Sequence, residues 1–405
     1  MRRGLAASPV VIAGSLGLAV AVMSGSVDAA EWYLNSRARQ DLSYDDNIGL
    51  RSAEDEKIAA FGETTSVGAK VGGRSPSLDI GLDALFNFTR FPSESGLNSN
   101  DQYITFTPAY TGERLTAEVD AQYIRDTTRT SDIEDSGLFI LQNRRREVRR
   151  LAPRLVYQLS PVDEASVEGD ISDTYYPSGD IRNFEQWGGA GTWTRTLSER
   201  TQALASVSGF KVNSNDSGSQ NTTYYAAQVG VGHVFTQKLR ARFSAGPTLA
   251  RVNFVFASGG FRFTNTETTL GYGFDGTVDY QYDERLSLQG RVYRTVRPSS
   301  TTGVVLEETG FRASGRYGLL QHVSLDLAAL YLLRENVGQS VRGGRRDFVS
   351  AEPAVLWRLA EDWDVRLGYR FRWQRLDDVD GAPDASSHSV LASLTYRLPP
   401  LFMSR

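Results

Sequence analysis

The sequence WDVRLGYRFRW, which spans Trp363 to Trp373, alternates strictly between two kinds of side chain. One set of alternate positions holds Trp363, Val365, Leu367, Tyr369, Phe371 and Trp373, and the other holds Asp364, Arg366, Gly368, Arg370 and Arg372. A period of two is typical of a β-strand, whose successive side chains point to opposite faces. An apolar face of this length with aromatic rings at both ends is typical of a strand that crosses a bilayer. The stretch therefore predicts a membrane strand with lipid on its aromatic side and water on its arginine side.

The same design recurs along the chain and predicts an all-β fold, a transmembrane antiparallel up-and-down β-barrel of about 18 strands. A first strand stands alone, eight hairpins follow, and a last strand closes the series. The predicted strands are 34–44, 65–71, 78–88, 103–110, 115–123, 148–157, 165–175, 187–196, 202–210, 225–235, 239–249, 270–282, 286–296, 311–319, 323–333, 349–359, 363–373 and 390–398.

Loop lengths give a second argument for a barrel. Connections after even strands are short, and those after odd strands are longer and rich in Gly, Ser, Asn and Asp. Bacterial barrels have this asymmetry, with short periplasmic turns and longer outside loops, so both termini are expected on the periplasmic side. The repeat length also resembles that of a propeller, but propeller blades have shorter strands than these.

The ends of the chain predict export and define the domains. Met1 to Ala29 reads as a secretory signal peptide, with Arg2 and Arg3 before an apolar run and small residues at the cleavage site. The barrel is expected over 30–398, and 399–405 forms a short C-terminal tail after Pro399-Pro400. An export signal followed by alternating strands predicts the outer membrane of a Gram-negative bacterium.

Composition excludes several classes of function. The chain has no cysteine, which excludes disulfides and thiolate chemistry, and its 48 acidic against 44 basic residues argue against nucleic acid as a partner. The histidines His233, His322 and His388 match no nucleophile motif, so we expect no enzyme. The acidic loop at 377–381 lacks the distal glutamate of a calcium loop, and we expect no metal and no cofactor.

Prolines recur on three strands that run toward short turns, at Pro108, Pro153 and Pro353. A proline inside a sheet loses a ladder hydrogen bond, so local bulges are expected there. A lipid-facing position that tolerates proline explains the recurrence better than a functional role.

The polar strand faces predict a charged lumen that is mostly acidic from Asp79 to Asp170 and mostly basic from Arg240 onward. Hairpin folding brings Arg154 opposite Glu168, Arg316 opposite Asp326 and Arg370 opposite Glu352, which predicts lumen salt bridges. Other lumen arginines have no acid directly across their own hairpin: Arg240, Arg242, Arg291, Arg312, Arg366 and Arg372. These predict a path for anionic solutes, and a purely structural network is an equal alternative. The rings of Trp363, Trp373 and Tyr282 are expected at the membrane interfaces.

The width of an eighteen-stranded ring favours an aqueous channel over a filled barrel. The apolar run 137–141 either folds inward as a constriction or lengthens its hairpin, and we favour the second.

The signal, the Tyr44-Asp45-Asp46-Asn47 end of the first strand, and turns such as Tyr282-Asp283-Glu284-Arg285-Leu286 carry a resemblance. In these features the chain resembles the outer-membrane β-barrel porins that are encoded with exopolysaccharide synthesis genes, and it is distantly similar to the alginate exporters. The resemblance implies a passive conduit for a secreted, anionic polysaccharide, with periplasmic export machinery as a partner. The alternatives are a general or solute-selective diffusion porin and a plugged structural barrel. In each case outer-membrane lipid and lipopolysaccharide surround the barrel, and polysaccharide or small solutes occupy its lumen.

Overall fold

The structure, a computed structural model, describes residues 31–53, 56–129, 143–178, 183–214, 220–258, 261–298, 305–337, 345–376 and 384–404. The predicted signal peptide, the apolar run 137–141 and the acidic loop 377–381 lie outside these residues.

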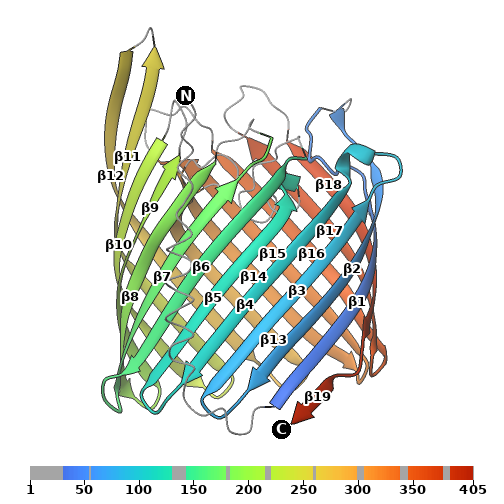
Figure 1. Cartoon of the computed structure of the whole chain (residues 1–405), viewed down its shortest axis with the longest axis horizontal. Coiled ribbons are helices and arrows are strands. Elements are labelled where there is room, and N and C mark those ends of the chain that lie inside the picture. The colour runs from blue at the N-terminus through green and yellow to red at the C-terminus, as the bar shows by residue number, and fades with distance from the viewer. Residues whose placement is uncertain are drawn as a thin grey trace.

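Eighteen long antiparallel strands form a closed barrel, in which each strand pairs with the next and β18 pairs with β1 (Figure 1). Every predicted strand overlaps one of them, so the predicted fold class is confirmed. The strands are β1 (Glu31–Asp45), β2 (Ala60–Arg74), β3 (Leu78–Arg90), β4 (Ser99–Thr111), β5 (Leu115–Thr127), β6 (Arg145–Gln158), β7 (Asp163–Tyr175), β8 (Phe184–Ser198), β9 (Thr201–Ser214), β10 (Gln220–Thr236), β11 (Leu239–Ser258), β12 (Phe261–Gln281), β13 (Leu286–Pro298), β14 (Val305–Leu320), β15 (Val323–Asn336), β16 (Arg346–Ala360), β17 (Trp363–Leu376) and β18 (Ala385–Arg397).

Strand β17 has the two faces that its alternation predicts. Leu367 is 56% exposed and Tyr369 is 41% exposed on the outer side, whereas Asp364 and Arg372 are only 5% and 3% exposed on the inner side. An apolar outer belt on a closed sheet suits a bilayer, because closure leaves no unpaired edge in the hydrocarbon. The barrel is therefore an outer-membrane barrel.

Short turns gather at one end of the barrel and longer connections at the other (Figure 1). The connection between β11 and β12 departs from the prediction, which ended the strands at Leu249 and began the next at Leu270. Both strands continue, and their pairing extends to Ser258 and Phe261 as a ribbon beyond the barrel rim (Figure 1). The Thr-rich segment from Thr264 to Thr269 explains this, because β-branched residues favour extended structure.

Among the described residues, no helix is long and apolar enough to cross a membrane.

The predicted bulges at the three prolines are absent, and this expectation was wrong. At Pro353 the pairing of β16 with β17 skips from Ala351↔Phe371 to Ala354↔Gly368 without a change of register. The β4–β5 ladder at Pro108 and the β6–β7 ladder at Pro153 are interrupted in the same way. Each proline thus removes ladder bonds on one side only, while pairing on its other side continues.

The four residues after Pro399-Pro400 form a short strand, β19 (Leu401–Ser404), which pairs with the start of β1. It lies at the end of the barrel that carries the short turns (Figure 1).

Candidate functional site

The lumen wall contains all three ion pairs that hairpin folding predicts. Arg154 lies 3.2 Å from Glu168, Arg316 lies 2.8 Å from Asp326, and Arg370 lies 2.7 Å from Glu352. In each pair the two residues sit on adjacent strands at facing or nearly facing positions, which is why a register count finds them.

Three of the arginines that have no acid directly across their own hairpin do have an acidic partner at another position, so they are paired and not free to meet a passing anion as expected. Arg291 lies 2.5 Å from Asp275 on the preceding strand. Arg366 lies 2.8 Å from Glu352, so that one carboxylate holds both Arg366 and Arg370. Arg291 and Arg366 were missed because their partners are displaced from the directly facing position, by two residues for Asp275 and by four residues for Glu352.

Arg372 has a partner from the other end of the sequence. Its guanidinium lies 2.6 Å from Asp45, and its side chain is only 4% exposed. Asp45 also accepts hydrogen bonds from the hydroxyls of Ser387 and Ser389 at 2.8 and 2.6 Å. This cluster joins β1 to β17 and β18 at the seam where the barrel closes. Arg372 therefore faces inward but is withdrawn from the open lumen.

Arg240, Arg242 and Arg312 remain as exposed inward-facing cations. None of them has an ion pair among the residues that the structure describes. Arg240 faces Asp279 by register, yet the two do not form an ion pair. Arg240 and Arg242 lie two residues apart on the same face of β11, so their Cα atoms are about 6.6 Å apart.

The opposite wall carries carboxylates. Glu118 and Asp120 on β5 face inward, and neither has an ion pair within the described ranges. Arg154 has Glu118 as its register partner but turns to Glu168 instead. Because β5 and β14 are nine strands apart in an eighteen-stranded ring, Glu118 faces the wall that carries Arg312 across the lumen. Among the described residues, the unpaired acids Glu118 and Asp120 thus lie opposite the unpaired Arg312, as the predicted acidic and basic walls require, although the unpaired Asp279 lies on the basic wall beside Arg240.

The first long connection narrows the extracellular mouth. Leu50 is 1% exposed and belongs to a cluster of buried residues with Tyr293, Leu332 and Phe348, whose side chains face inward from β13, β15 and β16. The Nε2 of Gln374 donates to the carbonyl of Leu50 at 2.8 Å. These contacts hold the segment after β1 inside the barrel wall.

A second cluster narrows the mouth from another side. It joins inward-facing Phe184, Val212 and Val252 of β8, β9 and β11 to Val296 and Val305 of β13 and β14. By the alternation of each strand, Val296 should face lipid as Val292 does on β13, and Val305 should face lipid as Phe311 does on β14. The extracellular ends of β13 and β14 are therefore folded beneath the neighbouring wall. Consistently, β12 and β13 pair only as far as Phe274↔Arg294, and β12 continues without β13 beyond that point.

Arg129, just beyond the end of β5, contributes a cation at this end of the barrel. Its guanidinium lies 5.0 Å from the centre of the Phe91 ring. Burial lowers the pKa of Arg129, and Asp101 acts in the opposite direction.

The predicted interface aromatics lie near the strand ends. Trp363 begins β17 and packs on Tyr396 with ring centroids 4.7 Å apart, and Tyr282 follows β12 with the Lys238 ammonium 5.1 Å from its ring. Trp373 lies toward the other end of β17. These aromatic positions fit the two girdles of a membrane barrel.

The three histidines are widely separated in the fold. His233 lies on β10 beside Thr201, His322 lies in the turn after β14, and His388 lies on β18 with its Nδ1 2.6 Å from the Tyr369 hydroxyl. Within the described part of the chain, no group of three or more histidine or acidic side chains is arranged to hold a metal.

Comparisons with known proteins yield solved structures alone, because no family model and no curated protein matches the chain. Similar structures include OccK5 (OpdH) of Pseudomonas aeruginosa, at 10% identity and a TM-score of 0.45 over 91% of this chain and 98% of that one. The outer membrane protein OpdK of P. aeruginosa matches at 12% identity and 0.44 over 93% and 99%. The outer membrane channel DcaP of Acinetobacter baumannii matches at 12% identity and 0.45 over 92% and 99%.

The closed barrel, its apolar belt and its charged interior make the protein an outer-membrane β-barrel. The export of an exopolysaccharide, which the sequence resemblance implies, finds no support in the structure or in these comparisons.

Proposed function

We propose that the protein is a solute-selective diffusion porin for small anionic solutes, above all carboxylates. The observation that carries this proposal is a group of exposed lumen cations on the basic wall, Arg240, Arg242 and Arg312, which have no ion pair among the described residues. A guanidinium keeps its charge at every physiological pH and binds a carboxylate through two parallel hydrogen bonds. Because these side chains are solvated, each contact is weak enough for a solute to leave again.

The extracellular mouth limits the size of the solute. Two packed clusters, around Leu50 and around Val252, occupy lumen space at this end. A polymer chain would have to pass both, whereas a small solute needs only the space between them. The mouth therefore favours small solutes over the polysaccharide of the sequence resemblance.

In this proposal the partners are outer-membrane lipid and lipopolysaccharide around the belt and small solutes in the lumen. Passage is passive and uses no cofactor.

The test is ion selectivity in planar bilayers, measured as the reversal potential in a salt gradient. The variant Arg240→Ala/Arg242→Ala removes two lumen cations. The matched control Arg149→Ala/Arg195→Ala removes two cations from the lipid-facing side, so that both proteins have the same net charge. We expect the first variant alone to lose anion preference and to lose current block by small dicarboxylates. Equal behaviour of the two variants, or a wild-type channel without anion preference, would refute the proposal.

A further inference from the structure

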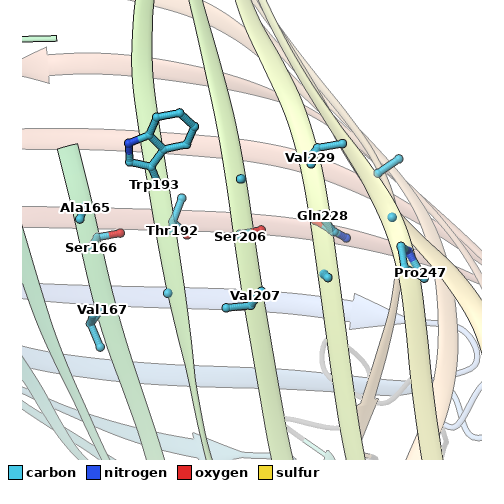
Figure 2. Close-up of a pocket in the computed structure, with 15 residues that line it drawn as sticks. Ala165, Ser166, Val167, Thr192, Trp193, Ser206, Val207, Gln228, Val229 and Pro247 are labelled. Carbon is cyan, nitrogen blue, oxygen red and sulfur yellow. The ribbon is translucent and has the colours of Figure 1, made fainter. Parts of the chain in front are cut away.

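The lipid-facing side of β7 to β11 is hollowed. A groove of about 630 Å³ crosses these five strands, and small residues form much of its floor. Its members lie side by side on adjacent strands (Figure 2). The small residues are Ala165, Gly191, Ala205, Ala227 and Ala245. The outside of a barrel is convex, so two barrels normally touch along a narrow line, and a hollow allows broader contact.

Large and small side chains alternate along the groove. By register, Ala205 lies between Trp193 and Val229, and in the next row Val207 lies between Gly191 and Ala227. Val207 and Val229 are 64% and 70% exposed, so they stand out beside the hollows. A surface on which large and small side chains alternate can pack closely against a copy of itself. In a bilayer, such packing between small residues is a main source of association.

Charges at the extracellular end of the same face provide an independent observation. Asp173 on β7 and Glu185 on β8 are register partners and point outward, and Lys211 and Arg251 point outward from β9 and β11. None of the four has an ion pair among the described residues. Two acids directly opposite each other are destabilising unless opposite charge comes near. Arg149 of β6 faces Asp173 by register and supplies one such charge, so Glu185 is the acid left without a facing cation. The face thus carries acids on β7 and β8 at one side and bases on β9 and β11 at the centre and the other side.

We propose that a second copy of this chain docks on this face, related by a two-fold axis along the membrane normal near β9. A two-fold contact is self-complementary, so β7 and β8 of one copy meet β11 and β10 of the other, respectively. Asp173 and Glu185 then lie near Arg251 of the second copy, while the two grooves interlock below. An acyl chain fits the hollow less well, because its phosphate-bearing headgroup would meet the two acids.

The chain has no cysteine, so single cysteines report proximity without interference. In outer membranes, Val207→Cys near the proposed axis should form a disulfide-linked dimer under mild oxidation. The matched control Ala392→Cys lies on the outer face of β18, nine strands away, and should not. If neither variant crosslinks, or both crosslink equally, the proposal is overturned.

Two further variants test the groove and the charges separately. Ala227→Trp fills the groove and should abolish the Val207→Cys crosslink, whereas Ala329→Trp on the outer face of β15 should leave it unchanged. Asp173→Lys/Glu185→Lys should weaken the crosslink, and addition of Lys211→Glu/Arg251→Glu should restore it. A crosslink that survives Ala227→Trp, or a monomer that retains bound lipid by native mass spectrometry, would overturn the proposal. These readouts measure association alone, so they stand apart from the selectivity test.

Discussion

Replacing Asp45 by Asn tests the cluster that closes the barrel. The Asp45 carboxylate is 12% exposed and is the ion-pair partner of Arg372, whose side chain is 4% exposed. It also accepts from Ser387, from Ser389 and from the backbone N–H of Asn47. The amide keeps the shape of the carboxylate but leaves the buried guanidinium without a counter-charge. Removing one partner of a buried pair costs about 3–5 kcal/mol, so we expect Asp45→Asn to lose about that much folding free energy.

The assay is reversible urea unfolding in lipid vesicles, followed by the heat-modifiable band shift of barrels in electrophoresis. Glu168→Gln is the matched control, because Arg154 and Glu168 are 49% and 50% exposed and an exposed pair contributes about 0–1 kcal/mol. In Asp45→Asn/Arg372→Met the uncompensated charge is gone, so part of the stability should return. If Asp45→Asn lies within about 1 kcal/mol of wild type, or if Glu168→Gln costs as much, the account of the seam is wrong.

Two other variants test local packing. Gly246→Val should prevent formation of the heat-resistant folded band, because a Cβ at Gly246 would overlap the Ala227 carbonyl oxygen. The control Gly290→Val should fold normally, because a Cβ at Gly290 meets no atom within 4 Å. A carboxylate is costly to bury against Leu332 and Phe348, so in Leu50→Asp the connection after β1 should leave the mouth and single-channel conductance should rise. The control Leu50→Met should keep the wild-type conductance. A folded Gly246→Val barrel would contradict the close packing at Gly246, and an unchanged conductance in Leu50→Asp would contradict the packing of Leu50 in the mouth.

The sequence predicts the barrel well because a lipid-facing strand must alternate at every position. The period of two in Trp363 to Trp373 sets the faces of β17, and each turn then sets the pairing of its two strands. The ion pairs Arg154–Glu168 and Arg316–Asp326 follow from this register alone. Contacts that lie within one hairpin are therefore open to prediction.

Contacts that depend on closure or on loop paths were not predictable in this way. Asp45 and Arg372 are 327 residues apart in the sequence, and they meet because β18 returns to β1. Leu50 has a positive φ of 45° in an irregular segment, where no periodicity indicates which way the chain turns. The sequence did not indicate that Val296 and Val305 fold inward, because both occupy alternate positions that face lipid elsewhere on their strands. For the Asp45–Arg372 contact, the one sequence feature that points to a partner for Arg372 is the pair of aspartates, Asp45 and Asp46, at the end of the first strand.

In the proposed porin, the two kinds of lumen feature act at different heights and on different properties of a solute. Leu50 and Val252 mark apolar clusters at the extracellular mouth, where the limit is size. Arg240 and Arg242 lie within a few residues of the short β10–β11 turn, at the periplasmic end, where the selection is by charge. A solute entering from outside meets the size limit while it is still solvated and the cations only after it has passed. If the protein is the proposed anion porin, a low-affinity cationic site behind a narrow mouth would draw small anions inward without retaining them, because every guanidinium contact there is open to water.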